Sequence, residues 1–320
     1  MREGQNPAKF IDSVAKPERV TVAVLTYIPF LAGYYADYLE VLKVCLGSLL
    51  TNTTPPYDLM VFDNGSGAET VLYLRSLQSE GKIQYLILSD KNLGKGGAWN
   101  IIFETCPGEI LAYADSDVLF SPGWLDESIR ILETYPDVGM VTGRPFRTSP
   151  EYYTQTLAWA RDAEESELNK GQFIPWETFR EFDMSLGQDE KDVLEHYKST
   201  QDIRIKYRGV EAQVGASHWQ FIAWKSVLQR FTPFDMDRPM GQVRDLDRKV
   251  NDACLLRLMT PEPFTMNMSN TLKDIPAVSA SLRPPSRKRT LRERILSFAP
   301  LKWVLLFIYN RIFRWYYSNR

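Results

Sequence analysis

Cysteine is scarce in this chain, and its scarcity excludes two kinds of structural support. Cys45, Cys106 and Cys254 are the three cysteines among 320 residues. They are odd in number, scattered along the chain and without the spacing of a metal site, so neither a disulfide framework nor a zinc site is expected. We predict that they are buried free thiols in a protein of a reducing compartment.

Long apolar runs are also missing. Residues 1–20 have no apolar core of the kind that a signal peptide requires. The apolar stretch Trp303–Tyr309 near the C-terminus is far shorter than the roughly 20 residues that a helix needs to cross a bilayer. The sequence therefore predicts a protein that faces the cytoplasm and has no membrane-spanning helix.

Charge is balanced overall but is distributed unevenly. The net charge is −2, and the content of hydrophobic (44%) and charged (24%) residues is that of an ordinary globular protein. Residues 283–320 contain ten Lys or Arg and one acidic residue, Glu293, so this tail carries +9 and the remainder carries −11. The asymmetry indicates an anionic partner for the tail.

The tail combines a basic linker with an amphipathic pattern. The linker starts at Arg283 and reads RPPSRKRTLRER. If residues 301–316 form a helix, one face is apolar, and it comprises Leu301, Val304, Leu305, Ile308, Ile312, Trp315 and Tyr316. Such a helix is typical of a segment lying in the headgroup region of an anionic membrane. The alternative is a helix docked on the acidic body of the chain or on a partner protein.

Apolar runs in the body of the chain alternate with helical patterns. Five strands are predicted, at residues 20–25, 59–62, 83–88, 109–114 and 138–142. This alternation is typical of a mostly parallel sheet covered by helices. Asp63 and Asp115 each follow such a strand, and in open α/β sheets ligands bind at the carboxyl ends of the strands.

Asp115-Ser116-Asp117 is the acidic turn on which the functional prediction centres. Two carboxylates one residue apart can share a divalent cation whose other positions are filled by water and substrate phosphates. The alternative is a solvated turn that caps a helix starting near Pro122. The segment Asn92–Thr105 before this strand has a Gly-rich start and carries Lys95, which has no apolar role.

Four motifs in order resemble those of a family 2 glycosyltransferase with the GT-A fold: VTVAVLTY, VFDNGSG, NLGKGGAWN and GEILAYADSD. They extend over roughly the first 145 residues. The resemblance implies an α/β, Rossmann-like, mostly parallel sheet with helices on both faces. It also implies that the nucleotide sugar is bound by Thr26, Tyr27, Asp63, Asn64, Asn92, Lys95, Gly97, Asp115 and Ser116. The metal, Mn²⁺ or Mg²⁺, would be held by Asp117 and Asp115, because a diphosphate leaving group needs a metal clamp.

The composition changes after residue 148. Residues 149–207 mix charged and aromatic residues with Gly and Pro breaks, and we predict a helical insertion beside the site. Trp159, Trp176 and Phe179 are expected in the core of the insertion, with sugar stacking as the alternative. His196 lies on a charged helical stretch and is expected to be solvated.

The acceptor side of the site is predicted after the insertion. Residues 208–217 are predicted to return to the sheet as a strand, and the resemblance implies that His218 and Trp219 then face the acceptor. A helix is predicted at residues 223–231. A second is predicted after Asp245 and Asp247, with Val250, Cys254, Leu255 and Leu258 on its apolar face. The resemblance makes Asp245 the general base, with Asp247 in reserve, whereas the alternative for both is capping of a helix start.

The chain departs from the family pattern in Phe264–Asn270, FTMNMSN. Many family members carry a histidine here that completes the metal site, and this chain has Asn267 and Asn270. An amide oxygen can still bind a hard cation, so Asn267 is the candidate third ligand.

The sequence thus predicts an inverting glycosyltransferase that uses a nucleoside-diphosphate sugar. We expect a glycan or lipid-linked acceptor, attachment of the tail to the cytosolic membrane face, and no nucleic-acid partner. A non-catalytic nucleotide-sugar-binding protein is the first alternative. A nucleotidyltransferase is the second, although TYIPFLAGYY follows Leu25 where such an enzyme would carry a Gly-rich phosphate loop. The predicted domains are 1–282 (nucleotide-sugar half about 18–148, insertion about 149–207, acceptor half about 208–282) and the tail 283–320.

Overall fold

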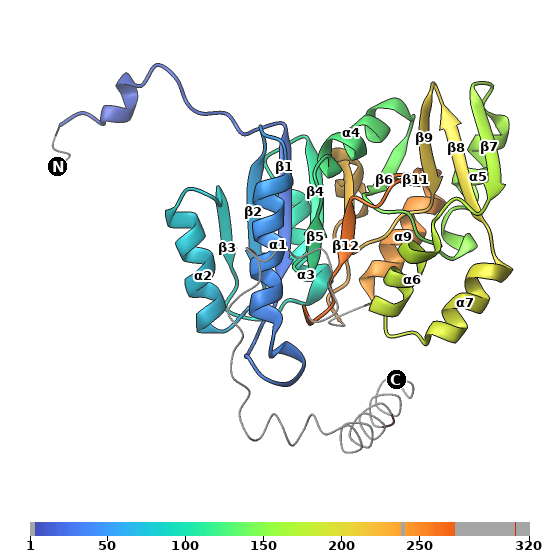
Figure 1. Cartoon of the computed structure of the whole chain (residues 1–320). Coiled ribbons are helices and arrows are strands. Elements are labelled where there is room, and N and C mark those ends of the chain that lie inside the picture. The colour runs from blue at the N-terminus through green and yellow to red at the C-terminus, as the bar shows by residue number, and fades with distance from the viewer. Residues whose placement is uncertain (1–3, 238–240, 273–310, 312–320) are drawn as a thin grey trace. The chain divides into compact units, whose positions relative to one another are not determined.

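The structure is a computed structural model of the chain, and it describes residues 4–237, 241–272 and 311. The predicted tail helix, 301–316, therefore lies almost entirely outside the described residues. Within the described part, a ten-stranded sheet has the order β3-β2-β1-β4-β10-β6-β11-β9-β8-β7 (Figure 1). Its strands are β1 (Val20–Thr26), β2 (Asp58–Asp63), β3 (Tyr85–Leu88), β4 (Ile110–Asp115), β6 (Val138–Thr142), β7 (Ser166–Gly171), β8 (Asp202–Tyr207), β9 (Val210–Val214), β10 (Gln220–Trp224) and β11 (Leu256–Met259).

The first half of the sheet is parallel, as predicted. β1 pairs in parallel with β2 and β4, and β2 pairs in parallel with β3. β10 runs antiparallel between β4 and β6, and β6 pairs in parallel with β11. Every residue of β1 is buried, which explains its unbroken apolar and β-branched sequence, because a strand covered on both faces has no polar side.

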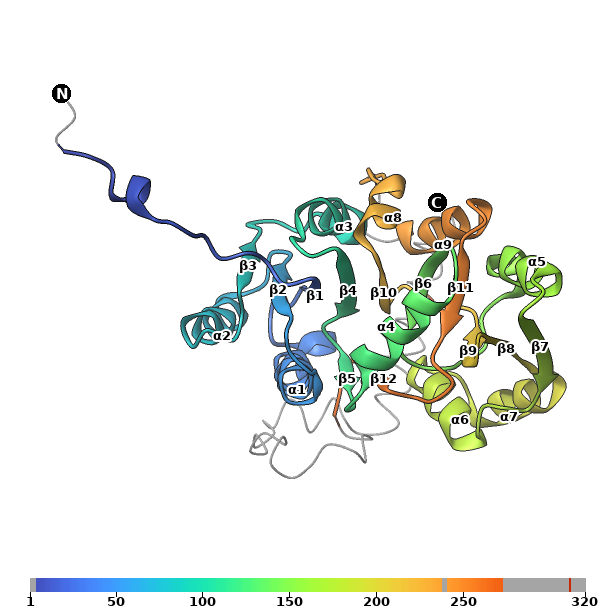
Figure 2. The same ribbon diagram turned by 90° about the horizontal axis from the view of Figure 1, so that it is seen from above.

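Helices cover both faces of the sheet (Figure 2). α1 (Tyr38–Asn52) and α4 (Trp124–Thr134) lie on one face, and α3 (Gly94–Thr105), α8 (Lys225–Leu228) and α9 (Gln242–Asp252) lie on the other. A hydrophobic core joins the second group to the sheet through residues such as Trp99, Phe103, Phe221 and Leu246. α2 (Ala68–Ser79) packs beside β3. The α/β architecture with helices on both faces is therefore confirmed.

Two predicted helix boundaries are wrong. Ala223 and Trp224 belong to strand β10, and the helix that follows is the short α8. The predicted helix through Leu258 ends at Asp252, because Cys254 has a left-handed φ of 57° and the next residues enter β11. Short apolar runs do not distinguish a central strand from a buried helix by periodicity.

The prediction for the cysteines is correct in two places and wrong in one. Cys45 and Cys106 are buried free thiols. Cys254 is exposed, because it stands in the left-handed turn between α9 and β11 rather than on the buried face of a helix. The left-handed conformation directs the Cys254 side chain away from the helix face on which its spacing in the sequence had placed it.

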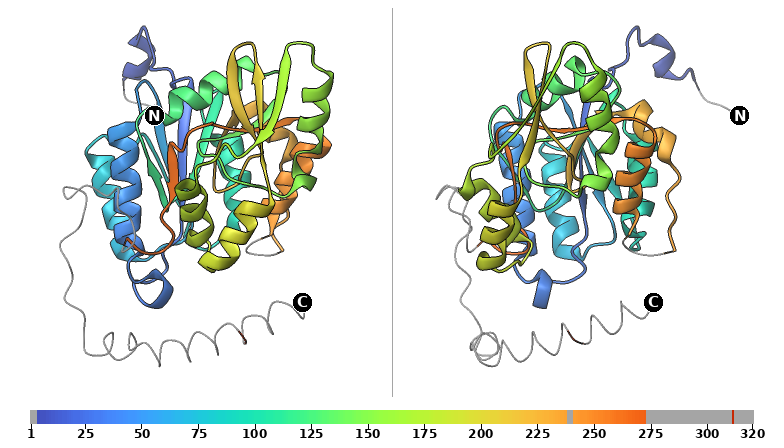
Figure 3. Two further views of the ribbon diagram at one scale, coloured as in Figure 1. Left: turned by 45° about the vertical axis from the view of Figure 1, so that its right-hand side comes forward. Right: turned by 90° about the vertical axis from the view of Figure 1, so that its right-hand side faces the viewer.

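The segment after residue 148 is not purely helical. It contains α5 (Thr154–Asp162), α6 (Trp176–Ser185) and α7 (Glu190–Ser199), but also β7 and β8, which extend the sheet in antiparallel fashion beyond β9. β7 was missed because its sequence, SELNKG, is polar and mostly exposed, as befits an edge strand. Figure 3 shows α6 and α7 toward the same end of the sheet as the segment before α1.

The core position predicted for the aromatic residues of this segment is confirmed for Phe179. Phe179 is buried with Ile174 and Val193, and Trp176 packs against them. Trp159 contacts the rings of Tyr135 and Tyr207 instead. Both tryptophans are partly exposed, and Trp176 lines a surface pocket with Met184 and Leu194. The His196 side chain is 46% exposed, as expected for a solvated histidine.

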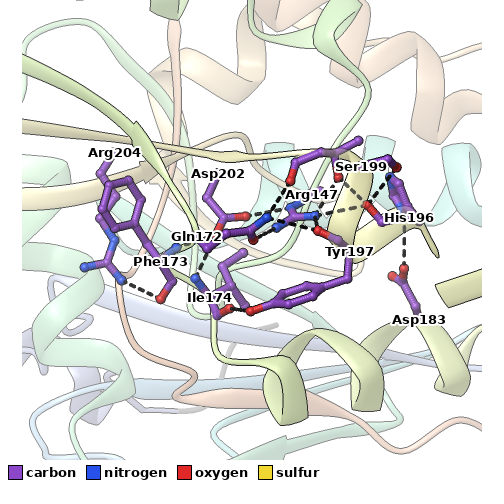
Figure 4. Close-up of polar contacts among 11 residues, drawn as sticks. Arg147, Gln172, Phe173, Ile174, Asp183, His196, Tyr197, Ser199, Asp202 and Arg204 are labelled. Atoms are coloured by element: carbon purple, nitrogen blue, oxygen red, sulfur yellow. Dashed lines mark hydrogen bonds and ion pairs between the residues drawn. The ribbon is translucent and has the colours of Figure 1, made fainter. Parts of the chain in front are cut away.

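An arginine fixes the segment to the sheet (Figure 4). The Arg147 guanidinium donates to Asp202 Oδ1 (2.6 Å), to Gln172 Oε1 (2.6 Å) and to the carbonyl oxygen of Tyr197 (3.0 Å). The second carboxylate oxygen of Asp202 accepts hydrogen bonds from the backbone N–H groups of Phe173 and Ile174. Because this ion pair is almost fully buried, it holds α7, β8 and the end of β7 in one arrangement.

A second, two-stranded sheet lies at the carboxyl end of β4. β5 (Val118–Phe120) follows the Asp115–Asp117 turn directly, and β12 (Thr265–Asn267) pairs with it in antiparallel fashion. Neither short strand was predicted from sequence. Every helix formed by residues 4–237 and 241–272 is too short or too polar to cross a lipid bilayer.

Candidate nucleotide-sugar site

Three predicted polar residues meet at one edge of the sheet. Thr26 is paired with Asp63 across β1 and β2, and Leu25 is paired with Asp115 across β1 and β4. The carboxyl ends of these strands form the lower end of the sheet in Figure 1. The parallel register thus brings together side chains that are separated by up to 89 positions in sequence, as the alternation of strands and helices predicted.

Asp117 carries an open carboxylate oxygen. Its Oδ2 accepts a hydrogen bond from the Tyr38 hydroxyl (3.1 Å), whereas its Oδ1 is buried and has no partner among the described residues. Burial and the neighbouring Asp115 carboxylate raise the pKa of Asp117 to about 7. Ionised Asp117 is therefore costly in the protein alone, and a bound cation would compensate that charge.

Asp115 is held by two side chains. The Tyr113 hydroxyl donates to Oδ1 (2.6 Å), and Lys95 Nζ donates to Oδ2 (2.7 Å). Lys95 also lies over the rings of Trp99 and Tyr113, at 5.3 and 5.7 Å from their centroids. The backbone N–H of Asp115 donates to the carbonyl oxygen of Trp219. Lys95, which had no apolar role in the sequence, therefore neutralises and orients Asp115.

β12 brings Asn267 beside the acidic turn. Asn267 is paired with Val118, and the backbone N–H of Met268 donates to the carbonyl oxygen of Asp117 (2.8 Å). The Asn267 side-chain oxygen already accepts a hydrogen bond from Ser269 N–H (2.7 Å) and keeps a second lone pair. Asn270 instead donates to the carbonyl oxygen of Tyr34.

The side chains here are of the chemical types that a hard divalent cation binds. Asp117 has an oxygen without a partner, Oδ1, whereas both oxygens of Asp115 and the amide oxygen of Asn267 already accept a hydrogen bond and would bind Mn²⁺ or Mg²⁺ through their remaining lone pairs. Within residues 4–237 and 241–272, no group of three or more His, Cys, Asp or Glu could hold a metal alone. A cation here would therefore depend on ligands from water and a substrate phosphate.

Thr26 and Asp63 present further open polar atoms. Asp63 Oδ2 accepts from Ser66 N–H (3.0 Å), closing the turn after β2. Asp63 Oδ1 and Thr26 Oγ1 are both buried and have no hydrogen-bond partner among the described residues. Buried polar atoms without partners are rare in proteins, and two on adjacent strand ends indicate a place for a polar ligand.

The other residues that were predicted to bind the nucleotide sugar form contacts within the protein. The Asn64 side chain accepts from Leu93 N–H and donates to Asn92 Oδ1, and Asn92 Oδ1 also accepts from Gly94 N–H. Both asparagines thus fix the start of α3. Of the three remaining predicted residues, Ser116 is buried and Tyr27 packs edge-on against Tyr35. A Cβ at Gly97 would lie 2.8 Å from the side chains of Leu93 and Met236.

The acceptor-side residues divide into exposed and buried groups. Asp245, in the first turn of α9, is 42% exposed and pairs with Lys249 (2.9 Å). Asp247 is buried: Arg257 Nη2 donates to its Oδ1 (2.5 Å), and His218 Nδ1 lies 3.0 Å from its Oδ2. The Trp219 ring is 6% exposed and stacks on Phe182 of α6, so it is not an open platform for a sugar.

Sequence reasoning missed Tyr38, Tyr113 and Arg257. Tyr113 lies two residues before Asp115 in an apolar strand, where its sequence context is that of a core residue. Arg257 lies in β11, where a charged residue amid apolar neighbours signals a buried ion pair. Tyr38 belongs to a cluster of aromatic residues. The high density of aromatic residues between β1 and the start of α1 was the signal in the sequence that could have pointed to it. This cluster comprises Tyr27, Phe30, Tyr34, Tyr35 and Tyr38.

Comparison with known proteins identifies the family. The family model described as glycosyl transferase family 2 matches residues 34–207, which is more than half of the chain. An uncharacterized glycosyltransferase of Nostoc sp. is 26% identical over 105 residues, which cover 33% of this chain and 33% of that protein. The match thus spans about a third of the curated relative.

Two solved structures resemble the chain in part. TarS 1–349 of S. aureus is 13% identical, with 78% of this chain and 60% of that chain covered and a TM-score of 0.46. The mannosyltransferase PcManGT of Pyrobaculum calidifontis, solved with GDP-Man and Mn²⁺, is 20% identical, with 78% and 56% covered and a TM-score of 0.43. The alignments cover less than two thirds of either solved chain. On the extent of the family match, this chain belongs to glycosyl transferase family 2.

Proposed function

We propose that the chain is an inverting glycosyltransferase that moves a sugar from a nucleoside-diphosphate sugar to an acceptor hydroxyl. The proposal rests on three buried side-chain oxygen atoms of a family 2 domain that have no hydrogen-bond partner among the described residues. They lie at the carboxyl ends of the central strands, and they are Thr26 Oγ1, Asp63 Oδ1 and Asp117 Oδ1. The first two suit a nucleoside, and the third suits a cation that binds a diphosphate.

The donor would lie along this edge from Asp63 to Asp117. Asp63 and Thr26 offer hydrogen-bonding atoms to the base and ribose. Asp117, Asp115 and Asn267 would hold Mn²⁺ or Mg²⁺, which supplies positive charge for the departing diphosphate. Lys95 keeps Asp115 in place through its 2.7 Å contact and adds positive charge on the same side.

The reaction is a direct displacement. The acceptor oxygen attacks the anomeric carbon, the bond from that carbon to the diphosphate oxygen breaks, and the hydroxyl proton passes to Asp245. Asp245 suits this role because it is partly exposed in the first turn of α9, whereas both oxygens of Asp247 are occupied. No enzyme nucleophile is needed, and the configuration of the sugar is inverted.

A non-catalytic nucleotide-sugar-binding protein is the second candidate. It is favoured by Asn267, which stands where many family members carry a histidine, and by the ion pair of Asp245 with Lys249. Slow hydrolysis of a nucleotide sugar by the purified protein separates the two, because a binding protein would leave the donor intact. A nucleotidyltransferase is a weaker alternative, because the segment after β1 is an aromatic cluster rather than a Gly-rich loop.

Nucleotide binding is the direct test of the proposed site. We expect UDP or GDP to raise the melting temperature in the presence of Mn²⁺ and much less in EDTA. A ligand at a hundredfold excess over its dissociation constant stabilises a protein by about 2.7 kcal/mol. ADP and CDP serve as comparison nucleotides in the same thermal-shift experiment. Absence of a metal-dependent shift with all four nucleotides would contradict the proposal.

The tail supports a proposal for where in the cell the protein acts. Its +9 charge and amphipathic pattern support attachment to the cytosolic face of an anionic membrane, where the acceptor would be a lipid-linked or growing glycan. We expect the full-length protein to co-sediment with vesicles containing phosphatidylglycerol at low salt, and a chain ending at Ser281 to stay in the supernatant. If neither protein sediments, the tail docks on protein instead; vesicles of phosphatidylcholine are the control.

A further inference from the structure

A cavity lies between the segment that follows β6 and the strands β8 and β9. Its volume is about 170 Å³, and residues 146–153, the end of α7 and the two strands contribute to its wall. One water molecule takes about 30 Å³ in the liquid, so the cavity has room for about five waters or for one small organic molecule. Phe146 and Val214 are buried in the wall, whereas His196 and Gln201 are exposed. The cavity therefore reaches the surface and is large enough for a ligand.

Two polar side chains in this wall have buried atoms without partners. Thr148 Oγ1 and Gln213 Oε1 form no hydrogen bond with any residue in 4–237 and 241–272. Gln213 is only 1% exposed and belongs to β9, in the interior of the sheet. Buried polar atoms are nearly always paired, because an unpaired one lowers the stability of the protein. Two of them around one cavity indicate a polar partner that the chain itself does not supply.

The buried charges at the cavity are already matched. Arg147 and Asp202 both line it and form an ion pair at 2.6 Å. The other N–H groups of Arg147 donate to Gln172 Oε1, the Tyr197 carbonyl oxygen and Thr200 Oγ1. The second oxygen of Asp202 accepts two backbone N–H groups (Figure 4). Neither an anion nor a cation would meet an unmatched charge in the buried part of the cavity, so the fitting ligand is neutral.

We infer that this cavity is a second ligand site, which binds one uncharged sugar unit through its hydroxyl groups. A hydroxyl donates to the Gln213 amide oxygen and either donates to or accepts from the Thr148 hydroxyl, so one kind of group pairs with both atoms. The apolar wall, with Phe146 and Val214, suits the C–H groups of a sugar ring, since ligand pockets combine apolar surface with a few polar groups that fix orientation. Sugars are the neutral hydroxyl compounds that a member of glycosyl transferase family 2 handles.

The second ligand site is separate from the proposed donor site. Thr142, Met259 and Gln213 lie in one row across β6, β11 and β9, so Gln213 is level with the carboxyl ends of the parallel strands. In the sheet, β9 is four strands away from β4, which ends at Asp115. At about 4.8 Å per strand this separation is about 19 Å. A sugar in the cavity is therefore not the sugar that reacts, and the inference goes beyond the proposed function.

Saturation-transfer NMR on the full-length protein tests for this site. The probes are the methyl glycosides of glucose, galactose, mannose and N-acetylglucosamine, in EDTA and without nucleotide. We expect saturation transfer to at least one of them. Glucose 6-phosphate and glucosamine carry a charge and should bind no more tightly than the neutral glycosides. Absence of transfer to all four glycosides, or tighter binding of a charged sugar, would overturn the inference.

Two substitutions assign the signal to the cavity. Thr148→Val and Gln213→Leu nearly keep the side-chain shape and remove one polar partner each, so each should weaken sugar binding about tenfold, as expected for one hydrogen bond. Ser149→Ala is the matched control, because it removes a neighbouring hydroxyl that contacts Glu151 outside the cavity. Asp117→Asn should bind the sugar like wild type. Unchanged affinity in both cavity variants, or a loss in Asp117→Asn, would overturn the inference. Absent nucleotide binding would count against the proposed function and leave this result standing.

Thermal unfolding separates a ligand site from an internal water site. The Thr148 hydroxyl has no partner among the described residues, so Thr148→Val should leave the melting temperature of the sugar-free protein unchanged or raise it. If an internal water already satisfies the hydroxyl, valine breaks that hydrogen bond and lowers the melting temperature. A lower melting temperature than that of Ser149→Ala would therefore overturn the inference.

Discussion

Replacing Asp117 by asparagine should strongly weaken Mn²⁺-dependent nucleotide binding and, at the same time, raise the melting temperature of the metal-free protein. The first effect follows from the loss of the charged ligand that has an open oxygen, Oδ1. The second follows from burial, because a neutral amide of nearly the same shape replaces a carboxylate that is costly to ionise in this position.

The pH dependence of the stability effect has a definite sign. The folded protein holds the pKa of Asp117 at about 7, above its ordinary value of 3.8, so the folded state binds the proton more tightly than the unfolded state. Asp117 therefore lowers the stability of the metal-free protein as the pH rises from about 4 to 7, and this contribution is not regained above 7. Asparagine avoids this loss, so Asp117→Asn should stabilise the protein more at pH 8 than at pH 5.

The measurement is thermal unfolding in EDTA at both pH values. Each pKa unit corresponds to about 1.4 kcal/mol, and each kcal/mol shifts the melting temperature of a domain of this size by about 2–4 °C. We expect a rise of several degrees at pH 8. Asp12→Asn, at an exposed position in the N-terminal segment before β1, is the matched control and should shift neither property. Nucleotide binding of unchanged affinity and unchanged metal dependence in Asp117→Asn would remove Asp117 from the site.

Replacing Asp245 by asparagine should lower sugar transfer by about 10²-fold or more while nucleotide binding stays normal. The change preserves the shape of the side chain and removes its ability to accept a proton, and general base catalysis contributes about 10²–10⁴-fold. Because Asp245 is 42% exposed, the fold should be unaffected. A full-length variant and wild type are compared in a transfer assay with the donor that the protein hydrolyses.

The same helix provides the control. Asp252→Asn, at the exposed last position of α9, makes the same chemical change away from the first turn and should retain wild-type transfer. Normal transfer by Asp245→Asn would show that another group takes the proton. Asp247→Asn is unsuitable for this comparison, because it leaves the buried Arg257 guanidinium without its carboxylate and should destabilise the protein itself.

Sequence reasoning succeeded where one local pattern determines one structural result. β1, β2, β4 and β6 were predicted because strands buried on both faces must be apolar throughout, and the polar residues at their ends follow from parallel topology. It failed for β5 and β12, since three residues are too few to show a period. It failed for β10 because the four-residue apolar run Phe221–Trp224 is compatible with helix or strand until its neighbours β4 and β6 are known.

The polar partners of the site were the least predictable part. The Tyr38 contact with Asp117 and the Arg257 contact with Asp247 join residues that no local spacing relates. The sequence also could not distinguish Asp245 from Asp247. Positions two apart on a helix point in different directions, and only the positions of β11 and His218 show that the second of them is enclosed.

The pairing of β5 with β12 has a consequence for the synthesis of the protein on the ribosome. Residues 4–120 supply Thr26, Asp63, Asp115 and Asp117, but the strand that lies against Val118 and brings Asn267 to the acidic turn is synthesised much later. Until then Asp117 lacks the neighbouring strand whose Met268 N–H binds its carbonyl oxygen. In the proposed site, a nascent chain that ends before β12 can form its parallel strands and still lack Asn267 beside the acidic turn. Fragments that end before β12 should therefore bind a nucleotide sugar more weakly than the chain that contains it.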